Sequence, residues 1–247
     1  MVSLRLKSSE DINHNTKLLR FEFPNPDAVS GLSLTSAVLT MSWPQGSLLP
    51  VLRPYTPVSQ LDQAGHLDLM VKRYPKGKAS THLHSLKPGD DLHFVAALKG
   101  YPWKPNEYPH VALIAGGAGI TPVYQLLQGI FQNPDDKTNV TLVAGVNSDR
   151  DVLLKEKLDD IKQRFPGRLK VVYVVSDPVA GSPFRKGYVT KEVLEDVLGD
   201  TAKENTKVFV CGPPAMEASL TGTRGWFGGK PGILQELGYR EGQIHKF

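Results

Sequence analysis

The spacing of apolar residues changes at residues 101–107, a polar, proline-rich stretch. This change is the sequence feature that most restricts the possible folds of the chain. Before it, short runs of alternating apolar and polar residues are separated by turn residues. Strands at this spacing predict an antiparallel barrel or sandwich. We prefer a six-stranded barrel, interrupted by one helix at residues 77–86. The expected strands include residues 17–23, 37–41, 66–72 and 92–96.

After this stretch, continuous apolar runs alternate with helical patterns. Such runs, followed by amphipathic helices, predict a parallel sheet covered on both sides, a Rossmann-like α/β fold. We therefore expect two domains, residues 1–105 and 106–247. The apolar runs are residues 111–115, 140–144, 169–175 and 208–211. The first helix face would carry Val123, Leu126, Leu127, Ile130 and Phe131, and the second Leu154, Leu158, Ile161 and Phe165.

Three residues are candidates for helix starts in this second half. Thr121 is expected to cap the helix that carries Val123, with Pro122 at its first position, and Thr190 to open a later helix.

Composition narrows the class of protein. The 247 residues are 40% hydrophobic and 22% charged, as in a soluble globular protein, and contain no apolar run long enough for a bilayer. Cys211 is the single cysteine, which excludes an internal disulfide and a cysteine-ligated iron–sulfur cluster. A net charge of +4 is too small to indicate nucleic acid. A cluster of basic residues could bind an anionic cofactor or an acidic partner protein, or it could be an ordinary solvated face. Its members are Lys72, Arg73, Lys76, Lys78 and Lys87.

The first candidate site is the stretch from Arg53 to Ser59. In an extended chain Arg53 and Tyr55 share one side and Thr56 takes the other. A guanidinium suits a phosphate and a phenol ring suits a planar group, so the pair could hold a flavin nucleotide. The alternative is an ordinary edge strand with a solvated Arg53.

The second candidate is the start of the helix at 77–86. Free amides at a helix N-terminus bind anions, Gly77 allows close approach, and Ser80 could add a hydroxyl bond. The alternative is a plain capped helix. His14, in the turn between the first two strands, would matter only if that turn reaches a ring-binding face.

Two further candidates follow strands of the second half, where such sheets bind ligands. Residues 116–122 follow the first strand and open a helix, so their glycines could approach a pyrophosphate, although the segment ends in proline rather than a third glycine. Residues 211–216 follow the last long strand, where a thiol could border a flat ring or simply pack. Asp177, after a third strand, is either a ribose ligand or a turn residue.

Four motifs, in their order along the chain, resemble those of the ferredoxin–NADP reductase superfamily. They are Arg53-x-Tyr55-Thr56, Gly77-Lys78-Ala79-Ser80, Gly117-x-Gly119-x-x-Pro122 and Cys211-Gly212-Pro213-Pro214. Within it, the chain is similar to the NADH-cytochrome b5 reductases. The pieces 53–59 and 211–214 and the ending 244–247 look most like the fungal-type mitochondrial branch.

The resemblance implies an FAD-binding barrel followed by an NADH-binding domain. By this likeness, Arg53 meets the FAD phosphates, Tyr55 packs on the flavin ring, and Cys211 lies beside the nicotinamide. Positioning of the reacting rings would fall to Thr56, Lys72, Cys211 and His14. The other implied cofactor-binding residues are Pro54, Val71, Tyr74, Gly77, Lys78, Ala79, Ser80, Gly117, Ala118, Thr121, Asp177, Gly212, Pro213 and Met216.

The chain also departs from the family pattern. Ala118 stands where the family usually has Thr, residues 99–102 differ from the animal enzymes, and the loop 222–232 with Trp226 suggests no role. The implied reaction passes a hydride from NADH to FAD and then single electrons to an acidic heme protein such as cytochrome b5. The alternatives are the reductase portion of a nitrate-reductase-like protein and a non-catalytic flavoprotein that senses NADH. We expect a monomer that faces the cytoplasm, either soluble or held at the mitochondrial outer membrane or endoplasmic reticulum by a segment outside this sequence.

Overall fold

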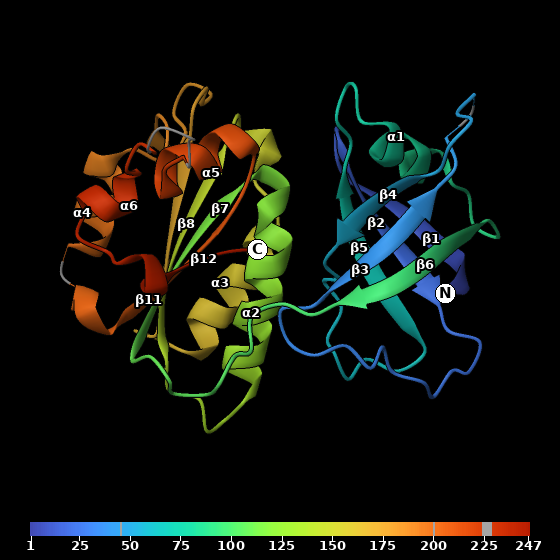
Figure 1. Ribbon diagram of the computed structural model, residues 1–247, viewed down its shortest axis with the longest axis horizontal. Coiled ribbons are helices and arrows are strands. Elements are labelled where there is room, and N and C mark those ends of the chain that lie inside the picture. Colours follow the sequence, from blue (N-terminus) through green and yellow to red (C-terminus); the bar gives the residue numbers. More distant parts are fainter. Residues whose placement is uncertain (45, 200, 224–228) are drawn as a thin grey trace. The chain divides into compact units, whose positions relative to one another are not determined.

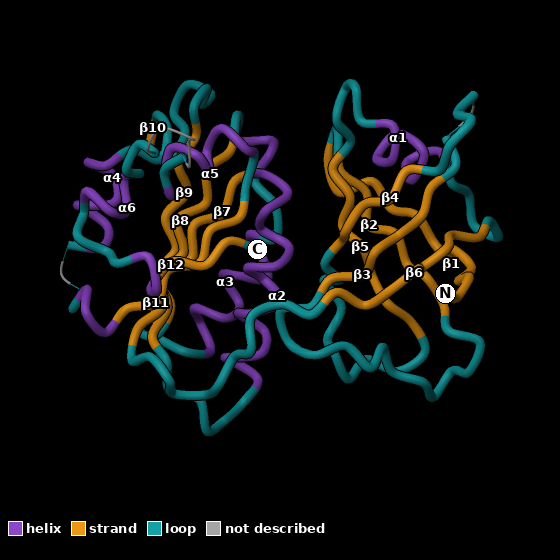
Figure 2. Tube along the Cα trace, viewed as in Figure 1, coloured by secondary structure: helices purple, strands orange, loops and turns teal. Residues whose placement is uncertain are grey.

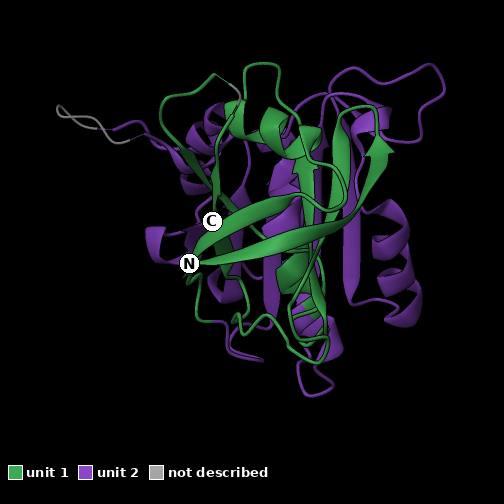
Figure 3. Cartoon of the chain, turned by 90° about the vertical axis from the view of Figure 1, so that its right-hand side faces the viewer, with its two compact units in different colours: residues 1–102, 124–128 green, residues 103–123, 129–247 purple. Residues whose placement is uncertain are grey.

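The computed structural model describes residues 1–44, 46–199, 201–223 and 229–247. Within it the chain forms two compact units, which Figure 3 shows in separate colours. The first contains Met1–Pro102 and Tyr124–Gln128, and the second Trp103–Val123 and Gly129–Phe247. The domain boundary expected at residue 105 from the sequence remains a prediction. Trp226, in the loop for which the sequence suggested no role, lies outside the described residues.

The first unit is an antiparallel six-stranded sheet curled into a barrel (Figure 1). The strand order is β4-β3-β6-β1-β2-β5, so β4 and β5 are its edges. Three residues after the end of β4, the Val58 amide donates to the Asp68 carbonyl of β5 at 2.9 Å, which ties the two edges together. The strands are β1 (Val2–Asn13), β2 (Thr16–Glu22), β3 (Ala37–Ser42), β4 (Val51–Tyr55), β5 (His66–Lys72) and β6 (Asp91–Leu98).

Alternating apolar residues fill the barrel. In β2, Leu19 and Phe21 are completely buried and point to one side of the sheet, as the period of a strand requires. Phe21 meets Phe94 of β6 edge-on, with ring centroids 5.3 Å apart. Helix α1 (Lys78–Ser85) lies at one end of the strands (Figure 2), and its Leu83 is buried in the same core. The predicted antiparallel barrel with one helix is confirmed.

The second unit is an all-parallel sheet in the order β10-β9-β8-β7-β11-β12. Helices α2 and α3 lie on one side of it and α4 and α6 on the other (Figure 1). The predicted Rossmann-like sheet is confirmed. The strands are β7 (His110–Gly116), β8 (Asn139–Val146), β9 (Leu169–Val175), β10 (Arg185–Lys186), β11 (Thr206–Cys211) and β12 (Ile244–Lys246). The helices are α2 (Ile120–Gln132), α3 (Lys155–Arg164), α4 (Lys191–Leu198), α5 (Pro214–Thr221) and α6 (Ile233–Glu236).

The buried faces of these helices follow the sequence pattern. All five residues predicted for the buried face of α2 are buried, and in α3 Leu158 and Ile161 are buried as expected. Leu154 and Phe165, predicted for the same face, flank α3 at its two ends and are only partly buried. On the other side, α4, α5 and α6 contribute leucines and valines to one core cluster with alternate residues of β7 and β11.

Helix starts are the part of the sequence prediction that needs correction. Thr190 caps α4, accepting a hydrogen bond from the Val193 amide. For α2, however, the cap is Gly119, and the Thr121 hydroxyl donates to the Ala118 carbonyl at 3.2 Å instead. A short 3-10 turn at Gly117–Gly119 precedes α2, which begins at Ile120, so Pro122 is the third residue of the helix and not its first. Within the described residues, every helix is too short or too polar to cross a membrane.

Candidate functional site in each unit

The Arg53–Thr56 stretch lies in and just after edge strand β4. Proline is tolerated at an edge because it has no amide hydrogen to donate, and Pro54 stands opposite Leu39 of β3. Tyr55 packs against the barrel core, whereas Arg53 is exposed. Burial raises the pKa of the Tyr55 phenol to about 12, with Arg53 opposing and Tyr74 adding to this effect. Arg53 and Tyr74 therefore both lie near the Tyr55 phenol.

The start of α1 is held by a compact turn. The Ser80 hydroxyl accepts a hydrogen bond from the Tyr74 amide at 3.2 Å and donates to the Gly77 carbonyl at 3.1 Å. A Cβ on Gly77 would lie 2.4 Å from the Ser80 Oγ and 3.1 Å from the Tyr74 Cβ, so only glycine fits without displacement. The hydroxyl proposed as a phosphate ligand thus already binds the turn that shapes the site.

No side chain caps α1, and its first turn holds no acidic residue. Gly77 occupies the cap position, so the alternative of a helix capped by a side chain is wrong. The first amides of a helix have no partner within the helix, and Lys78 beside them is exposed. An uncapped helix start with a neighbouring cation fits an anionic group such as a pyrophosphate.

The turn with His14 and the end of β5 lie side by side. Lys72 stands opposite Thr16 in the β2–β5 ladder, and the Arg73 amide donates to the Asn15 carbonyl at 2.7 Å. His14 is exposed, with its Nε2 2.9 Å from the Asn15 Nδ2. Val71, which the resemblance also implied as a cofactor-binding residue, has its side chain completely buried in the barrel core. Any contact of Val71 with a ligand would therefore come from its backbone.

In the second unit, the order of strands reverses between β7 and β11. Strands β8 and β9 follow on one side of β7, whereas β11 lies on the other. In sheets of this kind, ligands bind at the carboxyl ends of the strands beside such a reversal. Gly116–Gly119 and Cys211–Gly212 lie at the carboxyl ends of these two strands, and Cys211 stands opposite Ala115 in the ladder. The structure thus brings together two segments that the sequence had marked separately.

The two segments touch through their glycines. A Cβ on Gly119 would lie 2.2 Å from the Cys211 carbonyl oxygen, and one on Gly116 would lie 2.5 Å from the Met216 Sδ. Gly117, in contrast, has φ +52° and nothing within 4 Å of a Cβ, so it faces open space. Gly116 and Gly119 are therefore needed for packing, and Gly117 leaves room for a ligand.

Cys211 is half-buried beside an acidic residue that the sequence did not single out. Burial raises the pKa of its thiol to about 12, and the Glu217 carboxylate adds to this effect. The thiol is accordingly neutral at physiological pH and lacks the thiolate that a nucleophilic cysteine needs. The side chain is therefore suited to packing and not to nucleophilic attack.

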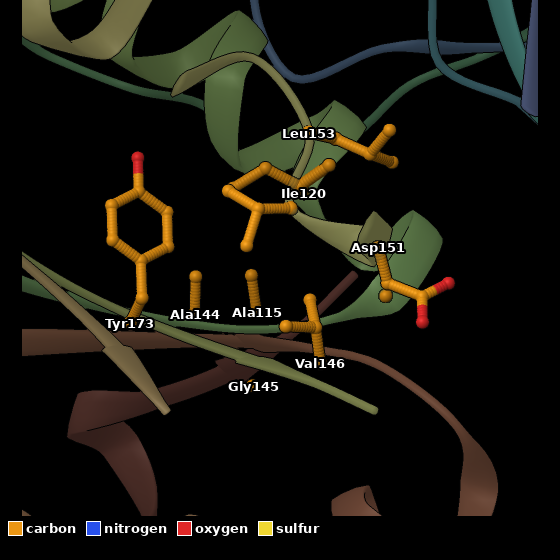
Figure 4. Close-up of a pocket in the computed structure, with 10 residues that line it drawn as sticks. Ala115, Ile120, Ala144, Gly145, Val146, Asp151, Leu153 and Tyr173 are labelled. Atoms are coloured by element: carbon orange, nitrogen blue, oxygen red, sulfur yellow. The ribbon is translucent and has the colours of Figure 1, made fainter. Parts of the chain in front are cut away.

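A small pocket opens at the carboxyl ends of β7, β8 and β9 (Figure 4). Its floor is apolar, and Tyr173 and Asp151 stand at its sides. Asp151 accepts hydrogen bonds from the Ser148 hydroxyl at 2.7 Å and the Ser148 amide at 3.2 Å. Gly117 and Ile120 belong to the lining, so the pocket adjoins the glycine turn. It is lined by Ala115, Gly117, Ile120, Ala144, Gly145, Val146, Asp151, Val152, Leu153 and Tyr173.

Sequence reasoning did not find this pocket. The spacing Ser148-x-x-Asp151 after a strand is a recognisable capping pattern, but nothing local connects it to Tyr173. Asp177 is not part of the lining. It is exposed just past β9, where its amide donates to the Asn147 carbonyl at 2.8 Å.

Comparisons with known proteins agree with this arrangement. The model of an oxidoreductase FAD-binding domain matches residues 3–100, and that of an oxidoreductase NAD-binding domain matches residues 113–221. An NADH-cytochrome b5 reductase 2 from Pyricularia oryzae is 50% identical, covering 100% of this chain and 75% of that protein. The protein of the same name from Emericella nidulans is 49% identical, covering 100% and 77%.

Solved structures are similar over the full length. The cytochrome b5 reductase domain of Ulva prolifera nitrate reductase has a TM-score of 0.83 and 28% identity, over 99% of this chain and 96% of that one. The CS-b5R domains of human Ncb5or, with a TM-score of 0.82 and 22% identity over 100% and 69%, show the same fold. With close relatives matched over the whole chain and both nucleotide-binding domains in the expected order, the chain belongs to the NADH-cytochrome b5 reductase family of flavin-dependent oxidoreductases.

Proposed function

We propose that this chain passes a hydride from NADH to bound FAD and then single electrons to an acidic heme protein such as cytochrome b5. The observation that carries the proposal is the pair of sites described above. The first is helix α1, which has an uncapped start and contacts the strand of Arg53 and Tyr55, and the second is a glycine turn packed against Cys211. FAD, when bound, would supply the chemistry that takes up two electrons together and releases them one at a time. The chain's own residues bind and orient the reacting groups.

In the first unit, the start of α1 and Arg53 would hold the FAD phosphates. Helix amides and a guanidinium both favour a negative group, and the first turn of α1 carries no acidic side chain to oppose it. Tyr55 is already fixed against the core and offers its ring to the flavin. Lys72, at the end of β5, would place positive charge near the ring, and Thr56 and His14 would border it.

In the second unit, the start of α2 would hold the NADH pyrophosphate. Gly117 leaves open space there, and Ala118 and Thr121 follow in the same turn. The adjoining pocket with Tyr173 would take part of the adenosine half. Asp177, exposed beyond β9, would accept from ribose hydroxyls and repel an added 2′-phosphate. Cys211, with Gly212, Pro213 and Met216 behind it, would border the nicotinamide.

An acidic acceptor fits the exposed cations of the first unit. Between Asp68 and Asp90 the sequence holds no carboxylate, and Arg73, Lys76 and Lys78 are all exposed. Attraction between opposite charges speeds the encounter of two proteins, and added salt weakens this attraction. We therefore expect reduction of cytochrome b5 to slow as ionic strength rises. The protein would act as a monomer, which light scattering after gel filtration would test.

The experiment that tests the proposal is anaerobic mixing of the purified protein with NADH, and separately with NADPH, while absorbance is followed at the flavin band. Rapid bleaching by NADH and slow bleaching by NADPH support it, and subsequent oxidation by cytochrome b5 supports the acceptor. A colourless protein, or a yellow one that neither nucleotide bleaches, would refute the reductase function. Bleaching without turnover by any acceptor would favour an NADH sensor. Transfer to a nitrate-reducing heme domain in preference to cytochrome b5 would favour the nitrate-reductase-like alternative.

A further inference from the structure

Glu217 lies in the first turn of α5 and has its carboxylate against the turn that carries Cys211. The Gly212 amide donates to the Glu217 Oε1 at 3.1 Å. Glu217 is half-buried, and within the described residues no lysine or arginine forms an ion pair with it. A negative charge is thus held, by a backbone hydrogen bond, one residue away from the thiol.

The surrounding contacts hold this charge in place. The Gly212 backbone packs against Gly116, because a Cβ on Gly212 would lie 3.2 Å from the Gly116 Cα and 3.0 Å from the Met216 Sδ. Gly119 touches the Cys211 carbonyl in the same way. The Cys211–Gly212 turn therefore has little freedom to move, and the carboxylate bonded to it has little freedom either.

A hydrogen bond to the turn accounts for a polar side chain here but does not require a charged one. Glutamine has the same shape and an oxygen that accepts the same bond. The charge matters for a different reason. NADH has a neutral nicotinamide ring, which becomes cationic when its hydride leaves with both electrons for the acceptor. A carboxylate fixed near that ring favours the cation over the neutral form, and so favours the transition state in which the positive charge develops.

We propose that Glu217 stabilises positive charge on the nicotinamide, so that it strengthens binding of NAD⁺ relative to NADH and accelerates hydride donation. This inference rests on the proposed function, because it takes Cys211 to border the nicotinamide. It assigns to Glu217 a part in selecting the redox state of the nucleotide, which is separate from the selection between NADH and NADPH expected of Asp177.

The test compares the wild-type protein with Glu217→Gln, which removes the charge and keeps the hydrogen bond. Dissociation constants for NAD⁺ and NADH are measured by titration calorimetry under anaerobic conditions. The control is Glu195→Gln on α4, an exposed glutamate whose loss changes the net charge equally. We expect the ratio of the NAD⁺ to the NADH constant to rise about fivefold in Glu217→Gln, from a screened charge acting over several ångströms, and not to change in Glu195→Gln.

A second measurement needs no nucleotide. Alkylation of Cys211 by iodoacetamide at fixed pH should be faster in Glu217→Gln, because loss of the carboxylate lowers the pKa of the thiol. An unchanged alkylation rate, or an unchanged ratio of the two dissociation constants, would overturn the inference. If the wild-type protein binds neither nucleotide, the proposed function fails and this inference fails with it. If both nucleotides bind and only the ratio is unaffected, the failure belongs to Glu217 alone.

Discussion

Replacing Gly119 with alanine tests whether the two segments of the second site depend on direct backbone contact. The backbone of Gly119 has φ −62° and ψ −7°, which alanine adopts without strain. The added Cβ, however, would lie 2.2 Å from the Cys211 carbonyl oxygen and 2.5 Å from its carbonyl carbon. Both atoms are backbone, so no side chain can rotate away, and the Cys211–Gly212 turn has to shift.

The size of the effect follows from two opposing contributions. Overpacking a tight site costs about 1–3 kcal/mol, and alanine recovers roughly 0.4–1 kcal/mol by restricting the unfolded chain. The net loss in the free energy of unfolding is then about 1–2 kcal/mol. For a chain of this size, that lowers Tm by roughly 2–8 °C. If NADH binds only when the Cys211–Gly212 turn is in its wild-type position, strain of this magnitude weakens NADH binding about tenfold.

The assay combines thermal unfolding, followed by circular dichroism, with anaerobic titration by NADH. Gly242→Ala is the matched control, because a Cβ there meets nothing within 4 Å and the backbone has no positive φ. FAD content should be equal in both variants, since Gly119 belongs to the second unit. A Gly119→Ala protein with the Tm and the NADH affinity of the wild type would show that the turns are not in contact, and the reasoning would be refuted.

Four further predictions concern the site residues Cys211, Ser80 and Asp177. Cys211→Ala should slow single-turnover reduction by NADH while FAD stays bound, and unchanged kinetics would rule out a role for the thiol. Because the pKa of Cys211 is raised to about 12 in the folded protein, its contribution to stability is complete below the unfolded value near 9 and is lost as pH rises toward 12. The free energy of unfolding, measured by urea titration from pH 8 to 11, should therefore fall less steeply with pH in Cys211→Ala than in the wild type. Ser80→Ala removes the bonds to the Tyr74 amide and the Gly77 carbonyl, so FAD should dissociate about tenfold more readily, as measured by recovery of flavin fluorescence on dilution; equal retention would mean that the turn holds without the hydroxyl. Asp177→Ala should raise the rate with NADPH relative to NADH, and an unaltered ratio would remove Asp177 from cofactor selection.

Local patterns in the sequence carry most of the fold. The strand predicted at residues 66–72 has the same bounds as β5 (His66–Lys72), and the spacing from Val123 to Phe131 selects the buried face of α2. These predictions succeed because strand and helix periods depend on neighbours within a few positions. Helix starts are less local. The sequence predicts Thr121 as the cap of α2, but the cap is Gly119, at the end of a 3-10 turn, and glycine has no side chain that could mark the boundary.

The sequence by itself determined the two fold classes, the order of the nucleotide-binding motifs and the family to which the chain belongs. Only the tertiary structure decided what those motifs touch. Gly119 meets Cys211 because β7 and β11 are neighbours in the sheet although far apart along the chain. Tyr173 and Asp151 share a pocket for the same reason. Val71 turns its side chain into the barrel core, and Glu217 reaches back to the Gly212 amide. Strand order and side-chain packing arise from contacts across the whole unit, and no pattern confined to one segment encodes them.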